Sequence, residues 1–511
     1  ITSDQSSSLL GYSVDGAGDV NGDGYADIIA GAYLYDSPET NEGAAFIFKG
    51  GPSGVGSSFP AYYKKLEADS ASAYFGMAVA GVGDVNKDGY ADVVVGAPYY
   101  AKSFTNEGAA FLFLGSSTGP SSTATWQSFG GQASAYYGRA LAGLGDLNGD
   151  TYPDLAVGAY YYDKGETDEG AVFVYYGSAM GYTGPVWTSE FNQASSYLGQ
   201  SVAGAGDVNA DGYDDVVVGA PYYDGAYTDE GVAMLYLGSA SGLLSAPSWM
   251  TYGGQASAMY GYYVSGGGDV NADGYDDVLV GAPGYDGTYS NQGKAYLYKG
   301  VSGSAGLSAT PSWSFPYSYS GAGCGTVAKA GDFNGDGYGD ILVGCPSYSG
   351  AYPYSGLTYL YFGNSSAVPS TYYTLAATSS QSNSYFGSLV APAGDVNRDG
   401  YDDFLVGAPY YDSTYTDEGA LYLYMGSTST PAIGWNLYGG QAGALAGGAG
   451  AGIGDYNGDG YLDVAAGLRG YANGQTGEGQ VRVYYGNSIS LGSTYTSYEA
   501  NQANAHFGRS V

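Results

Sequence analysis

The chain has 511 residues, including 90 Gly and 59 Tyr, and its 49 acidic residues against 14 basic ones give a net charge of −35. Glycine shows no period of three, which excludes collagen, and the apolar runs are strand-sized, far shorter than the ~18 residues of a membrane-spanning helix. A polyanion repels phosphate backbones and anionic lipid surfaces, so neither nucleic acid binding nor membrane insertion is expected.

An Asp-x-Asn-x-Asp motif recurs along the whole chain and defines its organisation. It begins eight times, at intervals of 60 to 65 residues, at Asp19, Asp84, Asp146, Asp207, Asp269, Asp332, Asp395 and Asp455. Self-similarity at a nearly fixed period is typical of repeat architectures rather than of several unrelated domains. We therefore interpret residues 1–505 as one array of eight units and residues 506–511 as a surplus strand or a linking tail.

Each unit contains four short segments with the composition of strands. In the second unit these are 75–81, 91–98, 109–115 and 124–129, which are rich in β-branched and aromatic residues and are separated by Gly, Pro and Asp. Such runs predict strands, here called A to D in chain order. Four antiparallel strands per repeat are typical of a propeller blade. The predicted fold class is all-β, a β-propeller of eight four-stranded blades, with seven blades plus an extra unit as the alternative.

The segment between strands A and B has the chemistry of a calcium loop. In the first unit it reads DVNGDGYAD (19–27), with Asp, Asn, Asp and Asp at positions 1, 3, 5 and 9, Gly at position 6 and Tyr at position 7. Alternate side chains converge when the chain curls, and the position-7 carbonyl adds another oxygen. An all-oxygen set of this size suits Ca²⁺ better than Mg²⁺, whereas a metal-free Asx turn is the alternative for any single loop.

The eight loops predict up to eight Ca²⁺ ions. The expected ligands are Asp19, Asn21, Asp23, Tyr25, Asp27, Asp84, Asn86, Asp88, Tyr90, Asp92, Asp146, Asn148, Asp150, Tyr152, Asp154, Asp207, Asn209, Asp211, Tyr213, Asp215, Asp269, Asn271, Asp273, Tyr275, Asp277, Asp332, Asn334, Asp336, Tyr338, Asp340, Asp395, Asn397, Asp399, Tyr401, Asp403, Asp455, Asn457, Asp459, Tyr461 and Asp463. Loop 3 has Thr151 at position 6 and Pro153 at position 8, so we expect it to be the weakest or the most distorted site. Three carboxylates repel one another in each turn, which couples metal binding to stability.

The combination of motifs resembles the FG-GAP repeat of the integrin α-subunit propeller. Phe-Gly and Gly-Ala-Pro flank the Asp-rich loop, the first at Phe75, Phe386 and Phe507 and the second at Gly96, Gly219, Gly281 and Gly407. The resemblance implies a calcium-binding propeller, extracellular or at the cell surface, that serves adhesion or recognition. Integrin propellers have seven blades and only some calcium loops, so eight complete units fit the similar repeats of bacterial extracellular proteins better.

Two classes of function follow for the faces of the propeller. The B–C loops carry Tyr and Asp, a mixture common in recognition loops, and the candidate ligand contacts are Tyr100, Tyr162, Tyr223, Tyr285 and Tyr411. These tyrosines could instead fill gaps between blades, as we expect for the five tryptophans of strand D. The chain is thus interpreted as an adhesive or structural surface module, a link of a fibre for example, or as a lectin-like module. Its partners would be proteins, glycans or copies of itself joined head to tail.

Catalysis is not expected. The chain has one histidine, His506, and no Gly-x-Ser-x-Gly elbow between a strand and a helix. Acid/base pairs of carboxylates are not excluded by this composition, but carboxylates repeated at metal-ligand spacing are a poor argument for one unique pair.

The cysteines and the chain end give two further expectations. Cys324 occupies the Phe position of Phe-Gly and Cys345 the Ala position of Gly-Ala-Pro in the same unit, so the two could face each other across the A–B hairpin. We predict a disulfide, with two buried thiols as the alternative. Residues 506–511 read as the strand A of a ninth unit. This strand would belong to a longer chain, lie inside the ring, or pair with a neighbouring molecule by β-augmentation.

Overall fold

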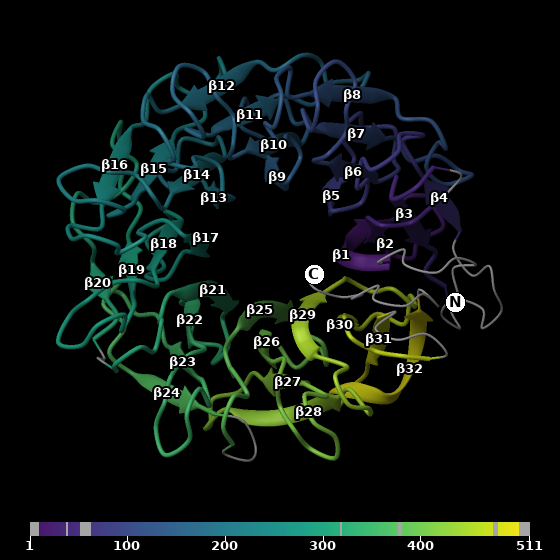
Figure 1. The fold of residues 1–511 in the computed structure, drawn as a ribbon. Coiled ribbons are helices and arrows are strands. Elements are labelled where there is room, and N and C mark those ends of the chain that lie inside the picture. The colour runs from purple at the N-terminus through teal and green to yellow at the C-terminus, as the bar shows by residue number, and fades with distance from the viewer. Residues whose placement is uncertain are drawn as a thin grey trace.

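The computed structural model describes residues 10–36, 39–51, 63–316, 319–376, 381–473 and 479–499. They form eight four-stranded antiparallel sheets arranged as blades in a ring (Figure 1). Every blade consists of four strands that are consecutive in sequence, with the first strand nearest the axis and the fourth at the rim. The prediction of an all-β propeller with eight blades is confirmed, and the seven-bladed alternative is wrong.

The strands are short: most have four to seven residues, and the extremes are two and nine residues. Blades 1 to 4 contain β1 (Leu10–Gly18), β2 (Asp27–Ala32), β3 (Ala44–Phe48), β4 (Lys64–Leu66), β5 (Ala78–Gly83), β6 (Asp92–Ala97), β7 (Ala109–Phe113), β8 (Trp126–Phe129), β9 (Ala140–Gly145), β10 (Asp154–Ala159), β11 (Ala171–Tyr175), β12 (Trp187–Glu190), β13 (Ser201–Gly206), β14 (Asp215–Ala220), β15 (Val232–Tyr236) and β16 (Trp249–Tyr252). Blades 5 to 8 contain β17 (Tyr263–Gly268), β18 (Asp277–Ala282), β19 (Lys294–Tyr298), β20 (Trp313–Ser314), β21 (Thr326–Gly331), β22 (Asp340–Cys345), β23 (Leu357–Tyr361), β24 (Tyr372–Leu375), β25 (Leu389–Gly394), β26 (Asp403–Ala408), β27 (Ala420–Met425), β28 (Ala432–Tyr438), β29 (Ala446–Gly452), β30 (Val464–Leu468), β31 (Gln480–Gly486) and β32 (Leu491–Glu499).

The Phe-Gly and Gly-Ala-Pro motifs meet where one blade packs on the next. A Cβ atom added to Gly96 would lie 2.0 Å from the Gly138 carbonyl oxygen of the following blade, so only glycine fits there. Phe75 was expected to begin strand A, but β5 starts at Ala78. Phe75 instead forms a parallel bridge to Gly43 of the preceding blade, because Gly76, with φ of +84°, turns the chain before the strand.

The strand-D tryptophans join neighbouring blades. Trp126 lies edge-on to Tyr175 of the next blade, with ring centroids 4.7 Å apart, and its Nε1–H donates to the Thr183 carbonyl oxygen at 3.0 Å. The same edge-to-face pairing recurs for Trp187, Trp249, Trp313 and Trp435. Edge-to-face pairs contribute about 0.5–1.5 kcal/mol beyond their buried area. The packing interpretation of these tryptophans is therefore confirmed.

Cys324 and Cys345 form a disulfide bond. Cys345 ends β22, whereas Cys324 lies just before β21 and forms a parallel bridge to Gly293 of the preceding blade. The bond therefore joins the Phe-Gly and Gly-Ala-Pro positions of the same unit, and Cys324 also lies beside the preceding blade.

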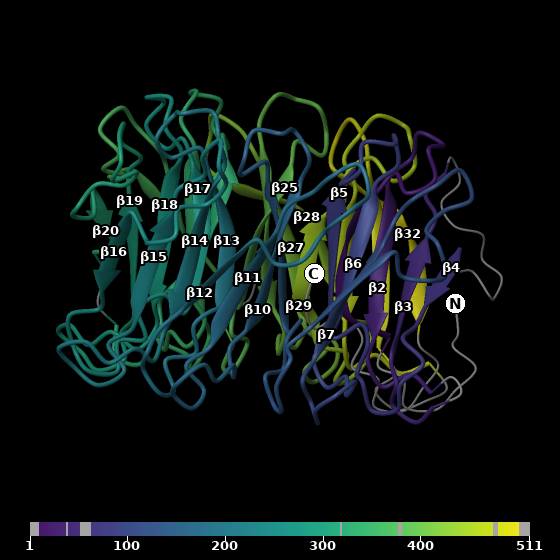
Figure 2. The same ribbon diagram turned by 90° about the horizontal axis from the view of Figure 1, so that it is seen from above.

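The ring places its connections on two faces, which Figure 2 shows at the two ends of the strands. The Asp-rich loops between first and second strands share one face with the turns that follow third strands, as shown by the hydrogen bond from Gly115 N–H to Asp92 Oδ1 at 2.7 Å.

The described residues include no helix long and apolar enough to cross a membrane. All eight first strands, β1 included, come from residues 10–452. The tail 506–511 and His506 lie outside the described residues.

Candidate calcium loops

The Asp-rich loops adopt one recurring turn. In loop 2, the Asp88 N–H donates to Asp84 Oδ1 and to Asn86 Oδ1, both at 3.1 Å. The Gly89 N–H donates to Asp84 Oδ2 at 2.8 Å. Positive φ angles of 59° at Lys87 and 91° at Gly89 curl the chain around these oxygens. The position-1 and position-3 oxygens thus reach the same amide, and the pattern recurs in loops 3 to 7.

The carboxylate at position 9 has a second role, which sequence reasoning missed. Asp92 is fully buried, and its Oδ2 accepts the Val85 N–H at 2.8 Å while its Oδ1 accepts the Gly115 N–H at 2.7 Å. The same two bonds occur in all eight blades. This Asp therefore ties the loop to the end of the third strand. The signal was present in the sequence as a glycine that follows each position-9 Asp by 23 residues.

Burial disfavours the ionised form of the position-9 carboxyl groups. It raises the pKa of the position-9 carboxyl from 3.8 to about 7 in seven loops, and the carboxylates at positions 5 and 1 add to the shift in most of them. In loop 6 the pKa of Asp340 rises to about 8 for the same reasons. The backbone N–H groups that bind the carboxylate oppose the shift in each case. A cation in the loop would favour the ionised form and offset the cost of burial.

The donor set of the loops fits a hard divalent cation. It consists of carboxylates, a side-chain amide and a peptide carbonyl, which are the oxygen ligands that Ca²⁺ prefers. In loop 8, Asp455 Oδ1 is buried and accepts no hydrogen bond. Calcium bound here would be held by positions 1, 3, 5, 7 and 9. Among the described residues no three His, Cys, Asp or Glu side chains are grouped as a metal cluster, so the ligands named above stay predictions.

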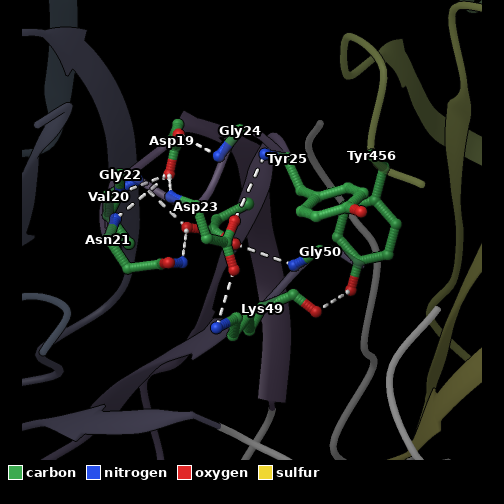
Figure 3. Close-up of polar contacts among 11 residues, drawn as sticks. Asp19, Val20, Asn21, Gly22, Asp23, Gly24, Tyr25, Lys49, Gly50 and Tyr456 are labelled. Carbon is green, nitrogen blue, oxygen red and sulfur yellow. Dashed lines mark hydrogen bonds and ion pairs between the residues drawn. The ribbon is translucent and has the colours of Figure 1, made fainter. Parts of the chain in front are cut away.

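Loop 1 differs from the others because a lysine reaches into it (Figure 3). Lys49 Nζ lies 2.6 Å from Asp23 Oδ2, and the Asn21 side-chain amide donates to Asp27 Oδ2 at 3.0 Å. In the other seven loops this amide donates to the position-5 carboxylate instead. A lysine ammonium beside a position-5 carboxylate competes with any cation for that oxygen, so we expect Lys49 to weaken calcium binding at loop 1.

The substitution Lys49→Gln is expected to tighten calcium binding at loop 1 alone. The ion pair is partly exposed, with 41% of the Lys49 and 26% of the Asp23 side-chain surface accessible. Solvent-exposed pairs are worth about 0–1 kcal/mol, so we expect up to about a fivefold gain in affinity. In a calorimetric calcium titration, the heat that corresponds to the binding of one ion should appear at a lower free calcium concentration than in the parent protein. Lys299 occupies the matching place before Gly300 and forms no ion pair within the described part of the chain, so Lys299→Gln is the matched control. An unchanged titration of Lys49→Gln would contradict the competition.

Loop 3 keeps the common turn despite its two departures. The Thr151 N–H donates to Asp146 Oδ2 at 2.6 Å, as the glycine N–H does elsewhere, although Thr151 must hold a φ of 75°. In six blades the position-8 N–H donates to the position-1 carbonyl of the preceding loop, as Asp214 does to Asp146 at 3.1 Å. Pro153 has no N–H for this bond. The expected distortion of the turn is therefore not seen, and the expected weakness of the site stays a prediction.

The pH dependence of stability should change sign with calcium. Without metal, the raised pKa values mean that the folded state binds more protons than the unfolded state between pH ~4 and pH ~7, so stability falls as pH rises through this window. Asp15, whose pKa burial raises to about 6, acts in the same direction. With calcium, protons and metal compete, so the gain from calcium should shrink below pH 7. Melting temperatures of metal-free and calcium-loaded protein from pH 5 to pH 8 test this; a metal-free melting temperature that rises over that range contradicts it.

The predicted ligand-contact tyrosines lie in the B–C loops and pack against the blades, and Tyr223 also contacts Phe191 of the preceding blade, with ring centroids 4.8 Å apart. Tyr100 is edge-on to Phe111 at 5.5 Å between centroids, and Tyr162 contacts Phe173 in the same way at 5.3 Å. Tyr223 and Tyr285 are half-buried, and only 3% of the Tyr411 surface is exposed. These rings thus fill gaps beneath the loops, which is the alternative interpretation, while their role in ligand contact stays a prediction.

Comparison of the sequence with known protein families identifies the same repeat without using the structure. The FG-GAP repeat family matches residues 10–48, 75–113, 137–175, 198–233 and 386–424, and the FG-GAP-like repeat matches 269–343. Together the matches cover more than half of the chain. The chain belongs to the FG-GAP repeat family. The predicted resemblance of this FG-GAP protein is therefore confirmed.

Known proteins that resemble this FG-GAP chain include integrin α-subunits. Integrin alpha-3 of Cricetulus griseus is 35% identical over 230 residues, which is 43% of this chain and 21% of the integrin. Phosphatidylinositol-glycan-specific phospholipase D of Bos taurus is 30% identical over 424 residues, or 74% of this chain and 49% of the phospholipase. A solved exotype rhamnogalacturonan lyase aligns with 97% of this chain and 73% of its own, at a TM-score of 0.46 and 14% identity. The chain thus spans about a fifth of the integrin and half of the phospholipase.

Proposed function

We propose that this FG-GAP propeller is a calcium-stabilised adhesion or recognition module that works outside the cell or at its surface. The observation that carries the proposal is the recurring Asp-rich turn, in which position 9 anchors the loop to the blade and positions 1, 3 and 5 gather oxygens. Calcium bound at these places would stiffen the ring from one face. Two observations support a location outside the cell or at its surface. The chain is related to integrin α-subunits, and it contains a disulfide, a bond that forms in oxidising compartments.

The opposite face carries loops that are held in fixed shapes. The buried Glu107 accepts hydrogen bonds from the Lys102 and Ser103 N–H groups, both at 2.5 Å, and Glu418 does the same for Ser413 at 2.8 Å and Thr414 at 2.5 Å. These glutamates belong to the Thr-Asn-Glu-Gly and Thr-Asp-Glu-Gly strings, so their role is to anchor the loops. A pre-ordered loop loses little conformational entropy on binding, which suits recognition.

An adhesion assay with purified protein tests the proposal. Beads that carry the propeller should bind a layer of extracellular glycoproteins in millimolar calcium and should lose that binding in chelator. A variant with position-5 alanines in two loops, Asp88→Ala with Asp211→Ala, should need more calcium than the parent protein. Binding that is equal in calcium and in chelator, or absent in both, contradicts the proposed function.

Glycan binding is the second candidate, and one feature of the loop face favours it. Seven half-buried tyrosines in blades 1 to 4 contact one another in sequence, with ring centroids 4.5 to 5.4 Å apart. We call this set the tyrosine arc; it comprises Tyr33, Tyr74, Tyr99, Tyr136, Tyr161, Tyr197 and Tyr222. Aromatic rings with hydroxyl groups offer both an apolar surface and hydrogen bonds, which sugar rings require.

Self-association into a fibre and catalysis have no such support. The tail that would link neighbouring propellers lies outside the described residues, so the fibre stays a prediction; deletion of residues 504–511 followed by light scattering tests it. We assign no catalytic role to this chain. The activity in the name of the phospholipase is a property of a protein of which only 49% is aligned.

A further inference from the structure

A cavity at the mouth of the ring is bordered by the tyrosine arc. It measures about 360 Å³ and is lined by Arg139, Ala140, Tyr160, Tyr161, Tyr197, Gln200 and Tyr222. A second cavity of about 580 Å³ continues along the first strands of blades 1 to 4 and shares Arg139, Ala140 and Gln200 with the first. Small-molecule sites usually have volumes of ~300–1,000 Å³, mostly apolar walls and a few polar groups that fix orientation. The mouth cavity has such a volume, and its lining of four tyrosines, Arg139 and Gln200 is more polar than that of a typical small-molecule site.

The charge of the mouth cavity is opposite to that of the chain. Arg139 is the one charged residue among the described residues that line it, in a protein with a net charge of −35. Asp15, which lines the inner cavity, accepts the Gly81 N–H at 3.0 Å. A guanidinium presents five N–H donors in a planar fork that matches a carboxylate. The Arg139 guanidinium donates a hydrogen bond to the Tyr160 hydroxyl, which lines the same cavity.

The aromatic wall is held in place by an unusual backbone. Three tyrosines of the arc directly precede the residue at the Phe position of the Phe-Gly motif. They are Tyr74, Tyr136 and Tyr197, and their φ angles are 53°, 49° and 53°. Bulky side chains rarely adopt this left-handed conformation. It recurs at the equivalent residues Met259, Tyr385 and Leu445, so it belongs to the repeat, and in the arc it fixes the direction of the tyrosine rings. Burial raises the pKa of Tyr160, Tyr197 and Tyr222 above the ordinary value. Their hydroxyls therefore stay neutral and can both donate and accept hydrogen bonds.

We propose that the mouth cavity binds a carboxylate-bearing sugar, a uronic acid unit, with its carboxylate on Arg139, its ring against Tyr161 and Tyr197, and its hydroxyls on Gln200 and the tyrosine hydroxyls. The inference rests on the recognition function proposed above and specifies its ligand class. Stacking rings select a sugar over a simple anion, and the guanidinium selects an acidic sugar over a neutral one. A carboxylate peptide is the competing ligand, and the test below includes it.

Saturation-transfer NMR and titration with defined probes test the proposal on the intact chain in calcium. The probes are digalacturonate, its methyl ester, and a tetrapeptide that contains one aspartate. We expect digalacturonate to bind at least tenfold more tightly than the ester and to displace the peptide. Arg139→Gln should weaken digalacturonate binding about tenfold or more and leave the ester unchanged, whereas Tyr197→Ala should weaken both. Lys64→Gln, which removes one positive charge from β4 at the rim, is the matched control and should bind like the parent.

Four outcomes overturn the proposal: no binding of digalacturonate by the parent protein, equal binding of the acid and the ester, equal binding of the peptide, or an Arg139→Gln variant that binds like Lys64→Gln. Each variant is first checked for an unchanged calcium-dependent melting temperature, so that a misfolded protein is not counted. If the parent protein binds no digalacturonate but keeps its calcium-dependent adhesion, only this inference is rejected. Loss of adhesion by the parent protein rejects the proposed function itself.

Discussion

Removing calcium should lower the melting temperature of this FG-GAP propeller by about 10 °C. At ten times its dissociation constant each ion adds about 1.4 kcal/mol by mass action, so eight ions add about 11 kcal/mol, comparable to the whole stability of a domain at ~5–15 kcal/mol. For a chain of this length the unfolding entropy converts such a loss into a shift of about 10 °C. Differential scanning calorimetry in millimolar calcium and in chelator measures it.

Magnesium is the control for this experiment. Mg²⁺ is smaller and gives up its water reluctantly, so it should restore little of the stability that calcium provides. Identical melting in calcium, in magnesium and in excess chelator would show that the Asp-rich turns are purely structural, and the calcium sites would then be wrong for the whole ring.

The substitution Asp215→Ala should destabilise the protein even when no metal is bound. It removes the buried acceptor of the Val208 N–H at 2.9 Å and the Gly238 N–H at 2.8 Å. A buried donor left without a partner costs about 1–3 kcal/mol, so the expected loss is about 2–6 kcal/mol. Asp211 occupies the exposed position 5 of the same loop. Its replacement by Ala should cost no more than about 0.5 kcal/mol without metal and should weaken one calcium site only.

Unfolding by denaturant in chelator and in calcium separates the two roles. Asp215→Asn keeps one oxygen as acceptor and should fall between the parent and Asp215→Ala. If Asp215→Ala and Asp211→Ala lose the same stability in chelator, position 9 has no anchoring role beyond metal binding.

The fold was predictable because its signals are local and repeated. The interval between Asp-x-Asn-x-Asp motifs fixed the number of units, and β-branched runs such as that of β6 marked the strands. The start of the first strand was placed too early, at Phe75 rather than Ala78, because the bridge from Phe75 to Gly43 joins two blades. Contacts between blades join residues of different units, so no pattern within one unit reports them.

The candidate site was predictable in composition but not in detail. The spacing of oxygens within one loop identified the turn, since those residues are neighbours in the chain. Lys49, which pairs with Asp23, and the glycine that binds Asp92 reach the loop from the third strand, and only the folded blade brings them there. The tyrosines of the B–C loops show the same limit, because burial against Phe111 or Phe173 decides which ring faces outward.

The order in which the blades are joined has a consequence for synthesis of the protein. Each blade is made of consecutive strands and packs on the blade made just before it, so folding can follow the growing chain from the N-terminus. Blade 1 meets blade 8 only at the end, through contacts such as the hydrogen bond from the Tyr456 hydroxyl to the Lys49 carbonyl oxygen, 407 residues apart. Until the last blade leaves the ribosome, one apolar side of blade 1, with Val14, Phe46 and Ile28 in its core, has no partner. A nascent propeller of seven blades is therefore an open arc, and its exposed apolar side is open to aggregation until blade 8 closes the ring.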